Sequence, residues 1–218
     1  MLGLNISSDF TWKIHCDKLA TQLNQKVGLL RRMKQRLPTE KLLLIAEAIF
    51  NSKVRYGSCV YIQPVFEKED LKAGKTTAEI NQLQVIQNKM LRVIFGFKQE
   101  DKTNMSRLRE NIKMFSINQL TSYHVLLEAY NVIYYGSSDI ILKKWLPQEE
   151  RHYPMRSQRS KNVKNVKVQV PDHVSCQGFG WYGAKMWNQL PNEIKELKDP
   201  DSFKVAIKRY IWENIPSY

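Results

Sequence analysis

Residue patterns that mark several familiar protein classes are missing from this chain of 218 residues. Glycine and proline number 9 and 8, too few for a collagenous or low-complexity protein. Charged residues interrupt every apolar stretch before it reaches the roughly 18 residues that a membrane-spanning helix needs. Residues 1–10 lack the basic, apolar and small-residue regions of a signal peptide. We therefore expect an intracellular protein, nuclear or cytoplasmic, with no membrane partner.

Patterns that carry metal or catalytic chemistry are also missing. Cys16, Cys59 and Cys176 lie far apart, no Cys-x-x-Cys occurs, and the four histidines show no ligand spacing, so we expect reduced thiols and no zinc site. The chain has no Gly-rich phosphate loop, no His-Glu-x-x-His and no Gly-x-Ser-x-Gly. The sequence therefore predicts no catalytic residue, no metal ligand and no cofactor.

Positive charge is what the chain has in excess. Lysine and arginine number 34 against 21 for aspartate and glutamate, which gives a net charge of +13. Like charges repel one another across a compact surface, so such an excess favours a polyanionic partner, and nucleic acid is the usual one. One alternative is a basic protein whose charge only keeps it dispersed. A weaker one is binding to an anionic membrane surface.

Apolar periodicity predicts a mainly α-helical fold. From Thr11 to Leu37 apolar residues recur every three or four positions up to Pro38, and a second helix is expected over 39–55. Their short connection predicts an antiparallel pair. Further helices are expected from a capping box at 76–79 to Gly96, over 106–113, from a capping box at 116–119 to Tyr135, over 180–189 and over 202–213.

Two segments lack a helical period. Residues 58–66 are aromatic and are expected to be extended or irregular. Residues 151–171 hold six Arg or Lys residues and no acid, and the alternation of Val166, Val168 and Val170 predicts a short strand. The expected fold is thus a multi-helix bundle with a small irregular or β element in its C-terminal third.

Several short strings follow one another along the chain. They are Leu2-Gly3 with Thr11-Trp12-Lys13 and His15; Gly28-Leu29-Leu30-Arg31-Arg32; Tyr56-Gly57, then Leu83-Gln84-Val85-Ile86-Gln87-Asn88-Lys89 with Arg92 and Gly96; Arg156-Ser157; and Gly183-x-x-x-Trp187-Asn188-x-Leu190-Pro191 with Ser202-Phe203-Lys204. In this order they resemble the C-terminal part of a non-LTR (LINE-type, jockey-like) retrotransposon reverse transcriptase. The segment 67–75 is longer than the family usually has, and Tyr61 stands where tryptophan is common.

The resemblance implies the thumb and post-thumb region of an RNA-directed DNA polymerase encoded by a transposable element. It divides the chain into the end of the palm plus a thumb-like helical region (1–98), a helical connector (99–150), and a basic loop with a C-terminal helical region (151–218). The family's palm binds two metal ions through an Asp-Asp motif, and this chain contains no Asp-Asp pair. We therefore expect the chain to lack the catalytic palm and not to be an enzyme on its own.

Three groups of cationic residues are candidate nucleic-acid contacts. The first belongs to the helix expected over 11–37, where a thumb would follow a phosphate backbone; a solvated helix face is the alternative. The second shares a polar face with Gln84, Gln87 and Asn88, for which RNA contact and simple solvation are evenly balanced. The third lies in the basic loop, where His152 and Tyr153 could stack on bases, with a disordered tether as the alternative. The groups are Lys26, Arg31, Arg32, Lys34 and Arg36; Lys89 and Arg92; and Arg151, Arg156, Arg159, Lys161 and Lys164.

The tryptophans and one histidine have two interpretations. Trp187 could be a base-stacking platform, but a core tryptophan whose helix ends at Pro191 is preferred. Trp12 and Trp181 are interpreted in the same way. His15, one turn from Trp12, is expected to be a packing residue rather than a ligand or a base.

Two functional hypotheses follow. The first is a nucleic-acid-binding fragment of a reverse transcriptase whose partners are RNA and RNA–DNA or DNA duplex, with a palm and fingers segment encoded upstream as a further partner left open. The second is a decayed or co-opted, non-catalytic protein-interaction scaffold. Salt dependence of RNA affinity separates them, because phosphate contacts release counterions.

Overall fold

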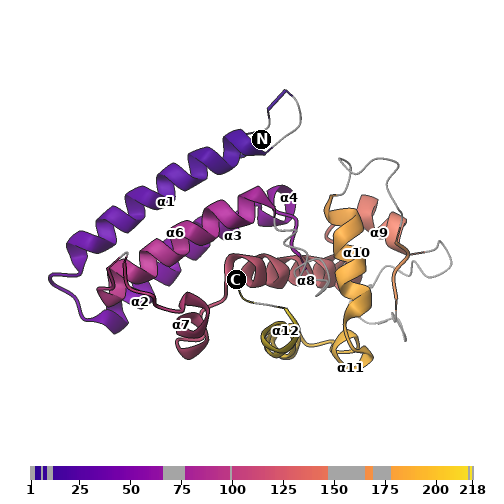
Figure 1. The fold of residues 1–218 in the computed structure, drawn as a ribbon. Helices are drawn as coiled ribbons and strands as arrows, with labels where there is room; N and C mark the ends of the chain where they lie inside the picture. The colour runs from indigo at the N-terminus through magenta and orange to yellow at the C-terminus, as the bar shows by residue number, and fades with distance from the viewer. Residues whose placement is uncertain are drawn as a thin grey trace.

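The protein is helical throughout the part that the computed structural model describes, which is residues 3–5, 7–8, 12–65, 77–98, 100–146, 165–168, 178–215 and 217 (Figure 1). No strand occurs among these residues. The elements are α1 (Lys13–Met33), α2 (Thr39–Ala46), the π-helical turn η1 (Glu47–Asn51), α3 (Ser52–Arg55), α4 (Ser58–Tyr61), α6 (Ala78–Phe95), α7 (Met105–Asn111), α8 (Ile117–Tyr135), α9 (Asp139–Trp145), α10 (Phe179–Gln189), α11 (Asn192–Lys195) and α12 (Pro200–Asn214).

The first two predicted helices are confirmed, and they pack on each other. Helix α1 contacts α2, η1 and α3 and packs even more extensively on α6, so the pair is one part of a larger bundle. Leu23 and Leu30 are fully buried and Ile45 packs against the same core. Residues after Met33 continue as turns up to Pro38, where Leu37 N–H still donates to the Met33 carbonyl at 3.0 Å.

The helix expected over 39–55 runs through α2, η1 and α3 and includes one π-helical turn. A π turn fits an extra residue into the helix, and such turns are frequent at functional sites. Beyond it the backbone reverses at Gly57, whose φ of 71° lies in the left-handed region that favours glycine.

The prediction that residues 58–66 are extended or irregular is partly wrong, because they begin with the helical turn α4. That turn is fixed by Tyr61, whose hydroxyl donates to the Val54 carbonyl at 2.6 Å. In the extended residues that follow, the backbone N–H and C=O of Val65 both bond to the Asn118 side-chain amide, at 2.9 and 2.8 Å.

The predicted strand around Val166 is wrong for residues 165–168, and Val170 lies outside the described residues. Val166 N–H donates to Asn188 Oδ1 and the Asn188 Nδ2 donates back to the Val166 carbonyl, both at 2.9 Å. Lys167 N–H donates to the Trp145 carbonyl at 2.8 Å. A helix-borne amide thus takes the place of a partner strand, as Asn118 does for Val65, so no β ladder forms.

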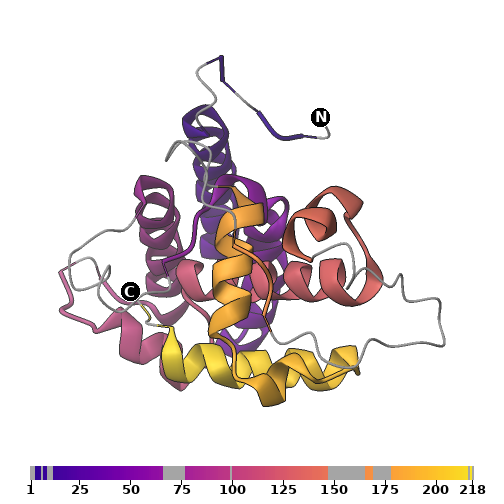
Figure 2. The ribbon, with the colours of Figure 1, turned by 90° about the vertical axis from the view of Figure 1, so that its right-hand side faces the viewer.

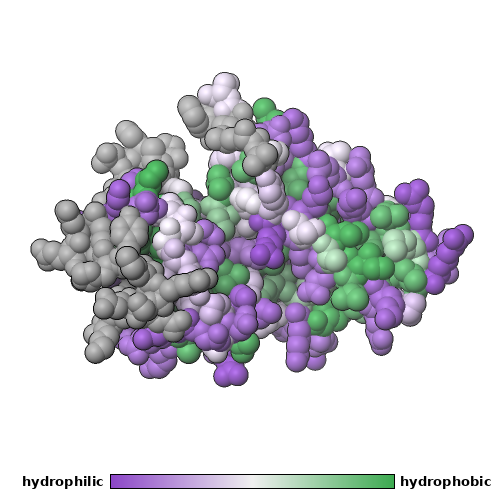
Figure 3. Space-filling view, turned by 180° about the vertical axis from the view of Figure 1, so that it is seen from behind, coloured by the Kyte–Doolittle hydropathy of each residue, from purple (hydrophilic) through white to green (hydrophobic). Residues whose placement is uncertain are grey.

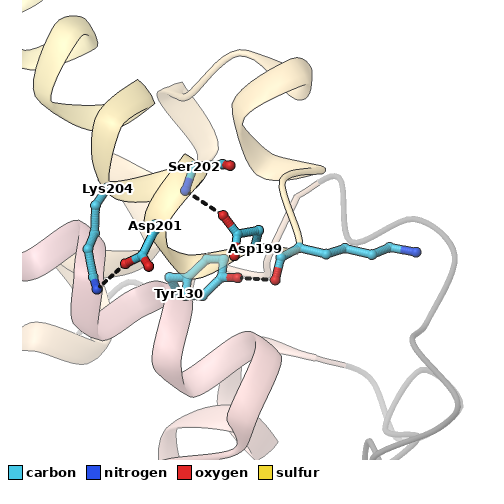
Figure 4. Close-up of polar contacts among 6 residues, drawn as sticks. Tyr130, Asp199, Asp201, Ser202 and Lys204 are labelled. Atoms are coloured by element: carbon cyan, nitrogen blue, oxygen red, sulfur yellow. Dashed lines mark hydrogen bonds and ion pairs between the residues drawn. The ribbon is translucent and has the colours of Figure 1, made fainter.

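Helix ends follow the signals in the sequence. Ser116 and Gln119 form the predicted capping box of α8, and Thr77 caps α6 by accepting from Ile80 N–H. Asp199 caps α12 by accepting from Ser202 N–H at 2.7 Å (Figure 4). The cap of α6 is therefore Thr77 rather than Thr76, and the expected capping box does not form there because the third helical residue, Ile80, has no polar side chain to return the bond.

Two apolar clusters share helix α8. The first joins α1, α2, η1, α3 and α6 with the beginning of α8, and the second joins the rest of α8 with α9, α10 and α12. Figures 1 and 2 both show α8 between the α1–α6 layer and α12. Residues 100–146, within the predicted connector, therefore contribute to both cores.

The second cluster contains Trp187. Trp187 is 0 % exposed and packs against Phe203 and Tyr134, which confirms its interpretation as a core residue. Trp12 and Trp181 are half-buried at the edges of the two cores. His15 is buried with its ring 4.6 Å from that of Tyr61, which confirms a packing role.

Candidate nucleic-acid interface

The cations of the first candidate group gather at the C-terminal end of α1. Lys26 is half-buried, and the other members (Arg31, Arg32, Lys34 and Arg36) are exposed. None of these side chains forms an ion pair with another residue of the part described. Positive charge at this place also complements the negative end of the α1 dipole. The end of α1 is therefore an accessible positive surface, which we call the α1 cation cluster (Arg31, Arg32, Lys34 and Arg36).

These charges surround the helix end instead of lining one face. At about 100° per residue, Lys26 and Arg31 lie about 140° apart and flank the buried stripe that contains Val27 and Leu30. Arg32 lies on the side away from that stripe. A phosphate chain running lengthwise along α1 would meet only some of these cations. A backbone crossing the helix end could meet most of them.

Lys34 also reaches the neighbouring helix α6. A Cβ atom added at Gly96, the residue that ends α6, would lie 2.7 Å from Lys34 Nζ. The ammonium group thus sits at the C-terminal end of α6, where helix carbonyls concentrate negative charge. Lys34 therefore stabilises α6 as well as adding charge to the surface.

The two glutamines of the polar face of α6 are buried, contrary to the sequence-based interpretation of an exposed face. Gln84 and Gln87 are 5 % and 0 % exposed. Gln84 Oε1 accepts from Ile117 N–H at 2.9 Å, and Gln87 Nε2 donates to the Phe115 carbonyl at 2.9 Å. The face joins α6 to the start of α8, so its glutamines are not available to bind RNA.

The two cations predicted on that face have partners within the protein. Lys89 is exposed and its Nζ donates to Asn24 Oδ1 of α1 at 3.1 Å. Arg92 is half-buried and its Nη1 donates to the carbonyls of Lys98 and Asp101, at 2.8 and 3.3 Å, so it holds the loop that follows α6. Lys89 keeps an accessible charge, whereas Arg92 has a structural role.

The third candidate group lies outside the described residues. It comprises Arg151, Arg156, Arg159, Lys161 and Lys164, with His152 and Tyr153.

A further set of residues, which sequence reasoning missed, forms a row of aromatic rings between α8 and α12. Phe115 lies 5.0 Å from Trp212 and 6.0 Å from Tyr123 between ring centroids, and Tyr123 lies 5.4 Å from His124. Lys208 Nζ sits 5.7 Å from the Tyr123 ring centroid. All four rings are half-buried. These residues come from three separate stretches of the sequence, so no local sequence pattern predicts that their rings lie side by side.

Positive charge surrounds this aromatic row. Burial raises the pKa of the Tyr123 hydroxyl, while the charges of Lys204 and Arg55 oppose that rise. Burial, together with the charge of Arg55, lowers the pKa of His124 to about 4. Lys204 forms an ion pair with Asp201 at 2.8 Å (Figure 4). At neutral pH the imidazole is therefore uncharged, and the local positive charge comes from Arg55, Lys204 and Lys208.

An apolar surface borders the α1 cation cluster. Leu44 of α2 is 65 % exposed, and Ala48 of η1 is also exposed. Figure 3 shows hydrophobic side chains gathered toward the end of the molecule where α1 and α2 meet, with mainly hydrophilic ones over the middle of that face. Exposed apolar patches of this kind mark protein contacts more often than phosphate contacts.

The two cysteines of the described part are not activated as nucleophiles. Burial raises the pKa of the Cys16 and Cys59 thiols to about 12, so neither is a reactive thiolate. Among the residues described, no cluster of His, Cys, Asp or Glu could hold a metal ion. No helix in the same part of the chain has the length and apolarity to cross a membrane.

Comparison with known proteins adds no relative. No protein-family model, no curated protein and no solved structure matches this chain.

Proposed function

We propose that this chain is a nucleic-acid-binding part of a non-LTR retrotransposon reverse transcriptase, corresponding to its thumb and post-thumb region, and that it does not polymerise DNA on its own. The observation that carries the binding proposal is the α1 cation cluster. It places four exposed positive side chains at one helix end with no acid paired to them among the described residues. A net charge of +13 points the same way.

The assignment to a reverse transcriptase depends on the ordered strings of the sequence. Trp187 and Phe203, from two of those strings, pack together in one core. In this proposal the cation cluster contacts the phosphates of an RNA–DNA or DNA duplex, or of RNA. Such contacts are independent of base sequence.

The experiment compares two variants that each lose four positive charges. The first is R31Q/R32Q/K34Q/R36Q, and the matched control neutralises exposed cations elsewhere, K144Q/K167Q/K198Q/R209Q. We expect the first variant to weaken binding to unrelated sequences alike and to flatten the salt slope by about 0.7 to 0.9 for each lost phosphate contact. Equal losses in both variants would show that only net charge matters and would contradict a defined interface.

A second candidate function is a protein-interaction scaffold, and the apolar surface around Leu44 favours it. In that case the four-charge variant keeps the affinity of the parent chain for RNA, and Leu44→Glu abolishes partner binding. Absence of RNA binding by the parent chain near 50 mM salt would favour the scaffold over our proposal.

A further inference from the structure

A cavity of about 420 Å³ lies between the N-terminal part of α1, helix α3 and the segment that precedes α1. This volume is within the usual range for sites that hold small ligands. Helix α3 contributes Ser52 and Lys53 to its lining. From α1 come four residues whose spacing places them on one helix face, and these are His15, Lys18, Leu19 and Gln22.

The segment that precedes α1 forms a wall of this cavity and is held in place from two sides. Asn5 N–H donates to His15 Nδ1 at 3.5 Å, and Lys18 Nζ donates to Asn5 Oδ1 at 2.9 Å. Burial and the charge of Lys18 lower the pKa of His15, so its imidazole is neutral and able to accept. Next to Asn5, the Leu4 side chain packs so closely on Gly57 that a Cβ added there would lie 3.0 Å from Leu4 Cδ2. The wall is therefore fixed both to α1 and to the turn before α4.

The charge in the lining of this cavity is entirely positive. Lys18 and Lys53 both line it and both are exposed, and none of the described lining residues is acidic. Lys53 forms no ion pair with another described residue. The ammonium group of Lys18 has three N–H donors, and Asn5 takes one of them. Two ammonium groups at one concave site, with no acid beside them, favour a ligand that carries negative charge.

Neutral polar groups stand beside the two lysines. Ser52 Oγ donates to the Ile49 carbonyl at 3.4 Å, which leaves its oxygen able to accept a hydrogen bond. Gln22 is exposed on α1, and its amide offers both a donor and an acceptor. Tyr56, which is 54 % exposed, adds an aromatic ring to the lining. The cavity thus combines cations for an anionic group with partners for hydroxyl groups.

We propose that this cavity binds a phosphate monoester carried on a sugar, with the phosphate at Lys18 and Lys53 and the sugar hydroxyls at Ser52 and Gln22. A monoester carries a charge of about −1.5 to −2 at pH 7, which matches two ammonium groups. A phosphate inside a strand carries one charge and continues in both directions, which the wall formed by Asn5 opposes. The ligand is therefore a free nucleotide or the phosphorylated end of a strand. The inference goes beyond the proposed function, because no residue of the α1 cation cluster lines this cavity.

The experiment uses the full chain and measures binding by calorimetry and by fluorescence anisotropy. The small probes are adenosine 5′-monophosphate, ribose 5-phosphate and adenosine, which lacks the phosphate. The strand probes are one short RNA with a 5′-phosphate and the same RNA with a 5′-hydroxyl. The test variant is K18Q/K53Q. The matched control is K13Q/K41Q, which removes two exposed charges from α1 and α2 that do not line the cavity.

We expect the parent chain to bind both phosphate monoesters at least about tenfold more tightly than adenosine, as a charged hydrogen bond provides. K18Q/K53Q should lose that preference, and K13Q/K41Q should change it less than about twofold. Lys53→Gln alone should weaken binding about tenfold without moving the wall, because Asn5 is held by Lys18 and not by Lys53. A preference for the 5′-phosphorylated RNA that K18Q/K53Q abolishes identifies a strand end as the source. Binding of the mononucleotide without that preference identifies a free nucleotide.

Three results would overturn the inference. They are adenosine binding as tightly as its monophosphate, equal losses in K18Q/K53Q and K13Q/K41Q, and displacement of the monophosphate by an equal concentration of sulfate. RNA that binds through the α1 cation cluster alone, with no effect of K18Q/K53Q on any probe, leaves the proposed function standing while this inference fails. A chain that binds the mononucleotide through Lys18 and Lys53 but binds no RNA gives the opposite outcome.

Discussion

The pH dependence of stability should be governed in part by His124. Its pKa is about 4 in the folded protein, because burial and the charge of Arg55 disfavour the imidazolium, against an ordinary value of 6.5. The unfolded chain therefore takes up a proton near pH 6.5 and the folded protein only near pH 4. Between these values the unfolded state binds more protons, so stability is fully present above pH 6.5 and falls as the pH falls.

The size of this effect follows from the two pKa values. Between pH 7 and pH 4.5 the linkage costs roughly 2.5 kcal/mol of unfolding free energy. The groups that act on or contact the imidazole are Arg55 of α3 and the Tyr123 ring on its own helix, and Glu47 of η1 lines the same cavity of about 660 Å³.

The assay is urea unfolding of the parent chain and of His124→Gln at both pH values, followed by circular dichroism. Other groups titrate equally in both proteins, so the difference between their pH dependences isolates His124. We expect the parent to lose roughly 2.5 kcal/mol more than the variant. Arg55→Gln should raise the pKa of His124 and reduce the difference. Parallel pH profiles for parent and His124→Gln would refute the reasoning.

Three further predictions concern the fold and the missing chemistry. Ser116→Ala removes the capping box of α8, which both apolar clusters share, and should cost about 1 to 2 kcal/mol in urea unfolding, with Ser116→Asp retaining most of the stability. Asn88→Leu removes the closer acceptor of the fully buried Arg109, at 2.6 Å, and leaves Ser217 Oγ at 3.2 Å, so it should cost about 1.5 to 3 kcal/mol. Arg109→Met should cost less, because it removes the charge as well. Purified protein should extend no primer with magnesium or manganese; nucleotide incorporation above background would contradict this.

The elements that the sequence predicts well are those with local signals. Ser116 and Gln119 form a capping box that marks the start of α8. Gly96 and Gly136, whose φ values are 81° and 62°, end α6 and α8. The burial of Trp187 follows from apolar periodicity before Pro191. In each case the residues that decide the structure lie within a few positions of one another.

The features that the sequence does not predict depend on distant partners. Gln84 and Gln87 have the composition of a solvated face, but their partners at 115 and 117 lie across the bundle. Val166 alternates as a strand does, but Asn188 takes the place of the neighbouring strand. Both outcomes arise because buried backbone groups must be satisfied by whichever donors and acceptors the fold brings near.

The same dependence on distant partners explains why the sequence predicts only part of the candidate site. Charge alone identifies the α1 cation cluster, because it is contiguous in sequence. Arg55, Tyr123 and Lys208 come from three helices, and only packing of α3, α8 and α12 brings them together. Their spacing along the chain carries no sign of this.

The central claim, that the protein binds nucleic acid through phosphate contacts, is tested most directly by affinity against salt concentration. Binding of the parent chain to an RNA and to a duplex of unrelated sequence is measured from about 50 to 200 mM salt. If the α1 cation cluster makes four contacts, the plot of log K against log salt has a slope of about −2.8 for single strands and about −3.6 for duplex. A slope near zero, or no binding at 50 mM salt, would contradict the account.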